Sequence, residues 1–532
     1  MRLIPTLLIL VCCHVALANT DQAILRLEHT TGSLPSPPLP LGLNLLQTSI
    51  EELGIYLGNG SLTSVDLVKA YLHNAERDNH QGLNLRAVIQ SAPTDNILAI
   101  ATALDAERHA GQIRGPLHGI PILVKDNMAT EIELGMDTSA GNTALKESKV
   151  KRDAEVVRKL RSAGAIISGK ANLNEFSGWK AYPRSASDAM GKGGTWGWSA
   201  VGGQTSSAYV EGGCEAGGNP LGSSSGSAVG VSAGFAAAAL GTDTTGSSIP
   251  PVALHYSVSV LDAVGPMGFT ARDTAILLDV LTYNDGRYLK ATQNPSLKSI
   301  RLGLVRRNFL DEADGRMTSL NACVSEVEQA LRSTMAMLSK VAGAAVIHVN
   351  MQLNFADLVR LNAATGVVMT TGFKEDLEGY MAGLAESPVR TLRDVVEWNE
   401  AHAKEEFPPG QCCQQRLLDS LVSPGRKSSE YKQAWQTIHE LGRDRGLGYL
   451  FDEYGMDALV FSPELGLPSG IVSPQGYAEG TAPMGYCKNG APFGILFVVR
   501  PGQEEKLLGI MAGYEAIMPR RRTPAPMEKT ST

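Results

Sequence analysis

The most constraining feature of this sequence is a pair of segments rich in glycine and small hydroxylated residues. The first, at 222–227, reads Gly-Ser-Ser-Ser-Gly-Ser, and the second, at 241–248, reads Gly-Thr-Asp-Thr-Thr-Gly-Ser-Ser. Such residues bury little apolar surface, and glycine costs about 0.5–1 kcal/mol relative to alanine inside a regular element. The intervening residues 228–240 are almost all apolar or small, which favours a tightly packed helix and strand over a flexible linker. The two segments therefore predict a site that holds hydroxyl groups close to bare backbone.

A third segment, at 119–127, reads Gly-Ile-Pro-Ile-Leu-Val-Lys-Asp-Asn and places Lys125 after an apolar run. In this order the three segments resemble the signature of the amidase signature family, whose catalytic triad is a lysine, a serine with a cis peptide bond and a nucleophilic serine. The resemblance assigns these positions to Lys125, Ser223 and Ser247. Ser223 and Ser247 are 24 positions apart, which is the separation that the family keeps.

The resemblance extends over most of residues 45–515, because 170–176 and 490–494 are also similar to family segments. It implies one large α/β domain with a mixed, largely parallel central sheet covered by helices. Helix and strand patterns alternate along the chain in agreement with this fold class. The expected elements are helices that begin near Ser49 and Ser64 and others at 95–111 and 156–160, with strands at 119–124 and 165–168.

The residue types at the three positions suit amide hydrolysis through an acyl-serine intermediate. A serine hydroxyl is a weak nucleophile until a base removes its proton, and a neutral lysine can be that base. The apolar residues 120–124 before Lys125 indicate burial, which lowers the pKa of a lysine. With the roles that the family implies, Lys125 is the base, Ser223 passes the proton and Ser247 attacks the carbonyl carbon.

The backbone just before Ser247 is the expected oxyanion hole. The N–H groups around Thr244, Thr245 and Gly246 would hold the developing negative charge. Two features depart from the family pattern: Thr245 stands where glycine or aspartate is usual, and the stretch 252–264 is shorter than its counterpart. We therefore expect 252–264 to be irregular and the catalytic rate to be low.

A long segment at 184–220 is rich in glycine, serine and tryptophan. In the family, the corresponding approach to the serine motif lies near the substrate channel, so Trp196, Trp198 and Gln204 are candidate substrate-binding residues. The alternative is that the tryptophans only hold a glycine-rich loop in place. From 302 to 449 the pattern is helical and carries no catalytic motif, so this region is expected to shape the pocket.

Charge and cysteine content exclude several other classes of function. The net charge of −7 provides no basic field for nucleic acid. No Cys-x-x-Cys or paired-histidine spacing indicates a metal site, so we expect no metal and no cofactor. Residues 222–226 also fit a Gly-x-Ser-x-Gly elbow, but no histidine stands in a recognisable catalytic context.

Beyond residue 18 the cysteines number five, so at least one thiol is expected to be free or paired between chains. They are Cys214, Cys323, Cys412, Cys413 and Cys487.

The amino-terminal residues have the pattern of a secretory signal. Arg2 precedes a mostly apolar run at 3–17, and Ala16-Leu17-Ala18 forms a small-x-small cleavage site. A membrane anchor is the alternative, but a run of about fifteen residues is short for a bilayer span of roughly twenty. The glycosylation acceptor Asn59-Gly60-Ser61 agrees with a secreted protein that has no stable membrane insertion. The expected organisation is a signal peptide at 1–18, a proline-containing lead at 19–44, an amidase domain at 45–519 and a disordered tail at 520–532.

Two other functions remain open at this point. The chain could be a non-catalytic binding protein that keeps the amidase fold, or the transamidating subunit of a tRNA-linked amidotransferase. The signal sequence argues against the amidotransferase. The expected partner is a small-molecule amide substrate, whose acyl group and amine the sequence does not identify; the oligomeric state is left open.

Overall fold

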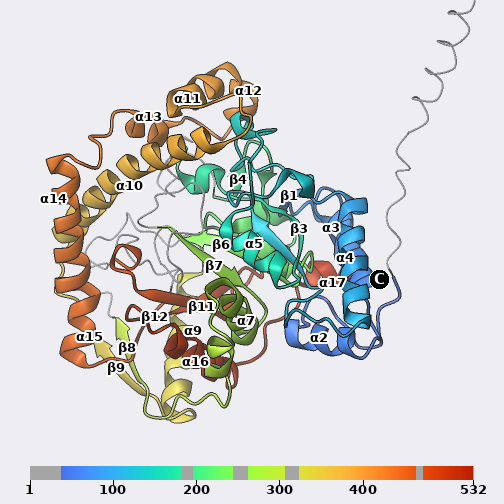
Figure 1. The fold of residues 1–532 in the computed structure, drawn as a ribbon. Coiled ribbons are helices and arrows are strands. Elements are labelled where there is room, and N and C mark those ends of the chain that lie inside the picture. Colours follow the sequence, from blue (N-terminus) through green and yellow to red (C-terminus); the bar gives the residue numbers. More distant parts are fainter. Residues whose placement is uncertain (1–36, 182–195, 244–261, 306–322, 463–470, 531–532) are drawn as a thin grey trace, which may run out of the picture.

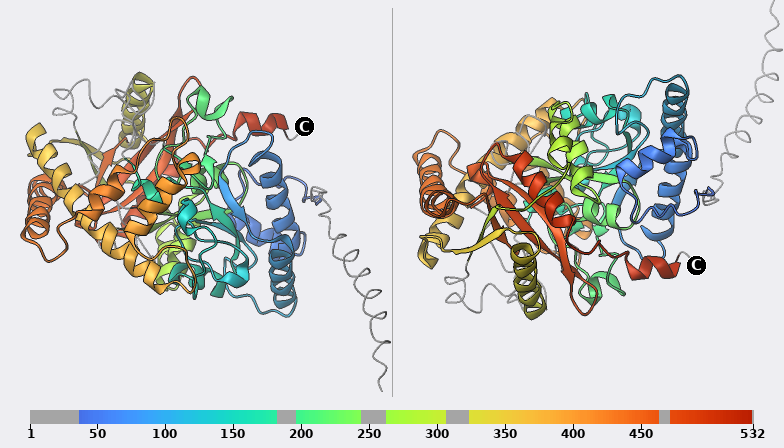
Figure 2. Two further views of the ribbon diagram at one scale, coloured as in Figure 1. Left: turned by 90° about the horizontal axis from the view of Figure 1, so that it is seen from above. Right: turned by 90° about the horizontal axis from the view of Figure 1, so that it is seen from below.

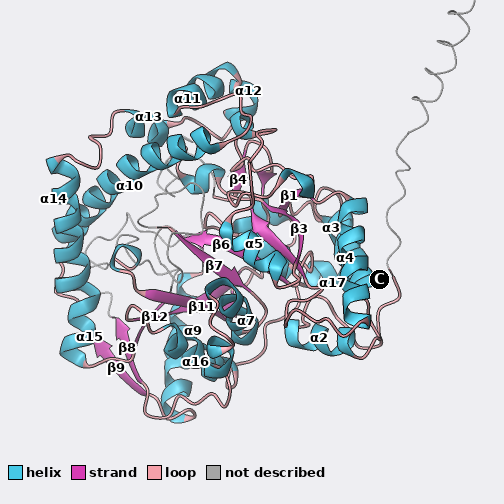
Figure 3. Cartoon of the chain, in the orientation of Figure 1, coloured by secondary structure: helices cyan, strands magenta, loops and turns pink. Residues whose placement is uncertain are grey.

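The computed structural model describes residues 37–181, 196–243, 262–305, 323–462 and 471–530. In these ranges the strands form two five-stranded sheets and one short hairpin, and helices pack on both large sheets (Figures 1 and 3). The expected α/β class with mixed sheets and a helical cover is confirmed. Antiparallel pairs are as common as parallel pairs in each large sheet, so the described strands are less parallel than expected.

The first sheet has the order β1-β3-β2-β6-β7. Its strands are β1 (Val88–Ser91), β2 (Pro121–Lys125), β3 (Ile166–Ala171), β6 (Ala238–Asp243) and β7 (Ala263–Met267). The central strand β2 pairs in parallel with β3 and β6, and every residue of β2 is buried. A central parallel strand is covered on both faces, which explains its continuous apolar run. Because Val124 pairs with Leu240, the carboxyl ends of β2 and β6 bring Lys125 and Thr242 to one place.

The second sheet has the order β11-β12-β10-β8-β9. Its strands are β8 (Arg301–Val305), β9 (Ala345–Val349), β10 (Ala458–Phe461), β11 (Ala478–Tyr486) and β12 (Pro492–Val499). The purely helical pattern expected over 302–449 is therefore wrong at β8 and β9. Each has five residues, of which four are apolar or glycine, and such short runs cannot be separated from a buried helix by periodicity alone.

Several helices begin where the sequence provides capping residues. Five of them have a reciprocal capping box, in which a Ser, Thr or Asn and an acidic residue three positions later bond to each other's backbone; they are α2, α3, α7, α10 and α11. The helices of the first half are α2 (Ile50–Gly58), α3 (Ser64–Asp78), α4 (Thr94–His109), α5 (Glu155–Ser162), α6 (Ser225–Ser232), α7 (Ala271–Thr282) and α8 (Arg287–Ala291). Those of the second half are α9 (Val324–Lys340), α10 (Phe355–Gly383), α11 (Leu392–Ala401), α12 (Ala403–Glu406), α13 (Gln415–Leu421), α14 (Ser429–Ile438), α15 (Gly448–Tyr454), α16 (Glu504–Glu515) and α17 (Ala525–Thr530).

One disulfide links the second sheet to its covering helix. Cys323, next to the start of α9, is bonded to Cys487, which follows β11. The bond joins positions 164 residues apart, and closing so long a loop restricts the unfolded chain strongly. Cys214, Cys412 and Cys413 are free, in agreement with the odd count in the sequence.

Several expectations fall on residues outside the described ranges. These are the signal sequence at 1–18, most of the shortened stretch 252–264, and the whole run from Thr244 to Ser248. None of the helices in the described part of the chain has the length and apolar character that crossing a membrane requires.

The carboxyl-terminal segment does not match the disorder expected for 520–532. Within the described part of it, residues 525–530 form α17, and the Met527 side chain is completely buried. The Arg521 guanidinium donates to the Leu46 carbonyl and lies over the Phe269 ring, 4.6 Å from its centroid. Figures 1 and 2 show α17 beside the amino-terminal helices. The polar composition of the tail was misleading because a single buried methionine and one arginine fix it to the core.

This packing predicts a stability effect for Met527→Ala. Removing a buried methionine side chain leaves a cavity, so the free energy of unfolding should fall by about 2–4 kcal/mol. Denaturant-induced unfolding of the full chain measures the change. Ala525→Ser, at an exposed position of the same helix, is the matched control and should change stability by less than about 0.5 kcal/mol. Equal and small effects of both changes would show that α17 is not packed on the core.

Candidate active site

Lys125 is the centre of a buried polar cluster at the end of β2. Its side chain is completely buried. The Nζ atom donates to Ser223 Oγ at 2.8 Å, Ser224 Oγ at 2.9 Å and Thr242 Oγ1 at 2.7 Å. The three hydroxyls come from the two glycine-rich segments that the sequence singles out. The structure thus places predicted residues Lys125 and Ser223 in direct contact, with Ser224 and Thr242 beside them.

The two glycines that flank this cluster are required by close packing. A Cβ on Gly226, in the first turn of α6, would lie 2.3 Å from the backbone nitrogen of Asn172. A Cβ on Gly241, in β6, would lie 2.8 Å from Ser224 Oγ. Real Cβ atoms do not approach other atoms so closely. Glycine at 241 therefore lets β6 lie close to Ser224, and glycine at 226 lets α6 lie close to the backbone of Asn172.

Ser224 fixes the two glycine-rich segments to each other. Its Oγ accepts from the Thr242 N–H at 3.1 Å and donates to the Thr242 carbonyl at 3.1 Å. One turn later, Ser227 Oγ donates to the Leu240 carbonyl at 2.9 Å. The hydroxyls at 224 and 227 therefore pair with the backbone of β6, and Ser224 braces the site.

Burial controls the charge of Lys125. It lowers the Lys125 pKa to about 7, although the negative charges of Asp262 and Asp243 act in the opposite direction. Desolvation disfavours the ammonium form, and uncharged hydroxyl partners compensate it only in part. Near neutral pH a large fraction of Lys125 is therefore the neutral amine, which is the form that can accept a proton.

Asn127 is a member of the site that the sequence analysis did not single out. Its Nδ2 donates to Thr242 Oγ1 at 3.1 Å and to Ser177 Oγ at 3.2 Å, and the residue is buried. The Thr242 hydroxyl thus accepts from both Lys125 and Asn127. The available sequence signal was its position two residues after Lys125, at the same strand end.

A second buried lysine lies on the neighbouring strand but has different partners. Lys170 Nζ donates to Thr138 Oγ1 at 3.0 Å and to the Met128 carbonyl, and it lies 3.9 Å from Asp126 Oδ1. Burial lowers the Lys170 pKa to about 8, while Asp126 opposes the shift. In contrast to Lys125, none of the partners of Lys170 named here is a serine hydroxyl. Lys125 is thus the better placed candidate base.

A pocket lies beside Ser223. Asn174 connects the two, because its N–H donates to the Ser223 carbonyl at 3.1 Å and the residue lines the pocket. The lining residues come from segments far apart in the sequence; they are Asn174, Glu175, Gly178, Lys180, Ala181, Trp196, Trp198, Glu406, Gln411, Cys412 and Cys413.

Not all of the predicted substrate-binding residues line this pocket. Trp196 and Trp198 line the pocket, whereas Gln204 is not among its lining residues. The Gln204 amide instead donates to the carbonyls of Trp196 at 2.8 Å and Thr205 at 3.0 Å. Gln204 lies in the short hairpin of β4 (Trp198–Ser199) and β5 (Gly203–Gln204), and its contacts hold the tryptophan loop.

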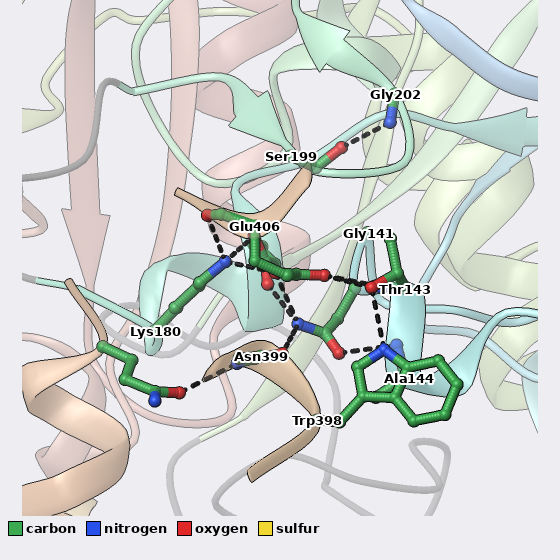
Figure 4. Close-up of polar contacts among 12 residues, drawn as sticks. Gly141, Thr143, Ala144, Lys180, Ser199, Gly202, Trp398, Asn399 and Glu406 are labelled. Carbon is green, nitrogen blue, oxygen red and sulfur yellow. Dashed lines mark hydrogen bonds and ion pairs between the residues drawn. The ribbon is translucent and has the colours of Figure 1, made fainter. Parts of the chain in front are cut away.

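Charged groups form the inner wall of the pocket. Lys180 Nζ donates to Glu175 Oε2 at 2.9 Å and also contacts the Glu406 carboxylate (Figure 4). Burial, reinforced by Glu406, raises the Glu175 pKa well above its ordinary value, although Lys180 opposes the shift. Burial would also raise the Glu406 pKa, but Lys180 and hydrogen bonds outweigh it, so that pKa is lowered. The two carboxyl groups of the wall therefore have pKa values shifted in opposite directions.

The same cluster joins the body of the protein to the covering helices. Thr143 donates to Glu406 Oε1 from its N–H at 2.9 Å and from its hydroxyl at 2.5 Å. Trp398 Nε1 donates to Thr143 Oγ1 at 3.0 Å, and Asn142 Nδ2 donates to Asn399 Oδ1 at 3.0 Å (Figure 4). These contacts hold α11 and α12 against the pocket.

The remaining predicted site residues cannot be placed. Ser247 and the expected oxyanion-hole residues Thr244, Thr245 and Gly246 lie outside the described ranges. No group of three or more potential metal-binding side chains occurs among the residues that are described.

The fold and the lysine–serine cluster resemble those of the amidase signature enzymes. Comparison with known proteins supports the same family. The family model Amidase matches residues 66–256. A Schizosaccharomyces pombe protein named as an amidase is 30% identical over 93% of this chain and 89% of its own length. An Arabidopsis thaliana protein named as an amidase is 30% identical over 93% of this chain and 94% of its own length.

A solved structure is similar to nearly the whole chain. The native peptide amidase of Stenotrophomonas maltophilia superimposes with a TM-score of 0.76 at 29% sequence identity, covering 92% of this chain and 99% of its own. This chain belongs to the amidase family.

The burial of Lys125 predicts a pH-dependent stability difference from Lys125→Met. The Lys125 pKa falls from 10.5 to about 7 on folding, so between these pH values the unfolded chain binds more protons and stability rises with pH. Methionine removes this dependence. Relative to the variant, the wild type should gain on the order of 3 kcal/mol between about pH 7 and 9.5.

Chemical denaturation at several pH values measures this difference. Exposed Lys146→Met is the matched control for loss of one positive charge. A wild-type minus Lys125→Met difference that does not vary with pH would contradict the lowered pKa.

Proposed function

We propose that this protein is an amidohydrolase that cleaves a carboxamide C–N bond through an acyl-serine intermediate on Ser247. The observation that carries the proposal is the buried Lys125 amine, 2.8 Å from Ser223 Oγ. Family membership supplies the partner, since Ser247 stands at the family spacing from Ser223. Neutral Lys125 accepts the Ser223 proton while Ser223 accepts the proton of Ser247, which activates Ser247 for attack on the carbonyl carbon.

A lysine with this pKa also suits the second half of the reaction. When the tetrahedral intermediate collapses, the departing amine needs a proton to become a good leaving group. Protonated Lys125 returns that proton through Ser223. The backbone N–H groups of residues 244–246 are the proposed donors to the oxyanion. Water then removes the acyl group by the same proton path.

The proposed substrate is a small amide whose acyl group enters the pocket beside Ser223. Support comes from Trp196 and Trp198, which provide a flat apolar surface at the pocket. Because the structural relative is a peptide amidase, the substrate screen should contain carboxyl-terminal peptide amides as well as primary amides, anilides and esters. Preference for peptide amides over small amides would contradict the proposed non-peptide substrate.

We also propose that the protein is secreted after cleavage near Ala18. The support is the pattern of residues 1–18 alone. Amino-terminal sequencing of protein recovered from the culture medium of its native host tests this point, and a retained leader would contradict it.

A serine-directed fluorophosphonate probe separates an active hydrolase from a binding protein with the same fold. Ser247→Ala should abolish both labelling and turnover, since it removes the nucleophilic oxygen, and the circular dichroism spectrum should not change. Ser248→Ala is the matched control and should keep labelling. If Ser248→Ala abolishes labelling and Ser247→Ala retains it, the nucleophile is the neighbouring serine. If the wild type neither labels nor turns over any amide, the binding protein is the better description.

The pH profile tests the role of Lys125. Because the amine must be neutral in the free enzyme and its pKa is lowered to about 7 by burial, kcat/KM should rise with pH through an apparent pKa close to that value. Lys125→Ala should remove this rise together with most activity. An unchanged rate in Lys125→Ala, with a flat profile from about pH 6 to 10, would exclude Lys125 as the base.

A further inference from the structure

Two adjacent thiols form part of the pocket wall. Cys412 and Cys413 lie in the loop between α12 and α13, and their Sγ atoms are 2.7 Å apart. Both line the pocket together with Trp196 and Trp198, and Cys413 is exposed. A small reagent from solution can therefore reach a pair of sulfur atoms that are already in contact.

The loop that carries the thiols is fixed at both ends. At its start, the Glu406 carboxylate is held by Lys180 and Thr143 (Figure 4). At its end, Gln414 Oε1 accepts from Asn399 Nδ2 at 3.0 Å, and Gln414 Nε2 donates to the Val396 carbonyl at 3.1 Å. Both anchors are buried, so the two ends of the loop are held in place by this network.

The local backbone brings the two side chains together. In extended backbone, adjacent side chains point to opposite sides. Cys413 instead has φ of 63°, in the left-handed region, which few residues other than glycine adopt and which folded proteins keep where the surroundings enforce it. This conformation accompanies the contact between the two sulfur atoms.

The protonation of the pair is compatible with stepwise oxidation. Burial and the adjacent Cys412 raise the Cys413 pKa to about 11. Near neutral pH Cys413 is therefore mainly the thiol, and it gives up its proton only as it reacts.

We propose that Cys412 and Cys413 form a redox modification site, which a low-molecular-weight disulfide such as oxidised glutathione converts to a vicinal disulfide on the pocket wall. The thiolate of one cysteine attacks the reagent's S–S bond, which breaks and releases one thiol, and a mixed disulfide forms. The second cysteine loses its proton to solvent and attacks the mixed disulfide at the protein sulfur, which releases the second thiol. Two protein thiols are oxidised and one reagent disulfide is reduced to two thiols.

The proposed bond differs in kind from Cys323–Cys487. Adjacent Cα atoms are about 3.8 Å apart across a trans peptide, below the usual disulfide span of about 4.4–6.8 Å. The Cα atoms of Cys323 and Cys487 are 5.7 Å apart, inside that span. Strained and exposed disulfides are the more easily reduced. The vicinal bond would therefore open under mild reduction that leaves Cys323–Cys487 closed, as a reversible site requires.

Peptide mapping of the full chain tests the modification without reference to amidase activity. Folded protein is treated briefly with dithiothreitol, then with oxidised glutathione, alkylated with iodoacetamide and digested with trypsin. The peptide 405–416, which contains both thiols and no other cysteine, should be two hydrogens lighter than the dithiol form and should carry neither glutathione nor alkyl groups. Cys412→Ser and Cys413→Ser should each leave one glutathione on this peptide. Cys214→Ser is the matched control and should close the pair as the wild type does.

Glutathione or alkyl groups on both cysteines of the wild-type peptide would overturn the proposal. A second arm, which rests on the proposed function, measures kinetics on an amide substrate. Closing the pair should change KM by a few-fold, reversibly, because it reshapes the wall beside Trp198, and Cys413→Ser should lose this response. An unchanged KM at complete closure would refute the link to the pocket. If no substrate is found, the mass result still decides the modification.

Discussion

The arrangement of this protein depends on the burial of one lysine among uncharged hydroxyl groups. An ammonium ion removed from water is costly unless a carboxylate or several dipoles compensate it. Around Lys125 the chain supplies Ser223, Ser224 and Thr242 as direct hydrogen-bond partners. The result is an amine whose pKa is lowered by burial to about 7. Lys170, close by on β3, is compensated instead by a carboxylate, because Asp126 Oδ1 lies 3.9 Å from its Nζ atom.

The composition of the glycine-rich segments follows from this requirement. Three hydroxyls can surround one Nζ atom only if α6 and the end of β6 approach each other and β2 closely. Gly241 permits the approach of β6, since a Cβ there would lie 2.8 Å from Ser224 Oγ, and Gly226 lets α6 lie close to the backbone of Asn172. The apolar residues of β2 then provide the desolvation. In these segments serine and threonine supply the hydroxyl groups and glycine permits close backbone packing, although such residues bury little apolar surface.

The pocket beside this cluster depends on a second, separate set of interactions. Its wall is a buried network in which Glu175, Lys180 and Glu406 balance charge, and in which Thr143 and Asn399 connect α11 and α12 to the body. A network of this kind is favourable only when its members are satisfied. Helices α11 and α12 are therefore positioned by polar contacts at the pocket as well as by apolar packing, and the loop with Cys412 and Cys413 lines the same pocket as the tryptophans.

The sequence alone determined the parts of this protein that depend on neighbours along the chain. The capping residues marked the start of α2, the apolar run marked β2, and the glycine-rich segments marked the hydroxyls that meet Lys125. Only the tertiary structure decided which distant groups come together. Asn127 reaches Thr242 through the fold, the pocket combines Trp198 with Glu406 and Cys412, and the polar tail is ordered because Met527 finds a buried site. The physical reason is that capping and periodicity are local, whereas burial, and with it the pKa of a lysine, is set by residues that the chain brings in from elsewhere.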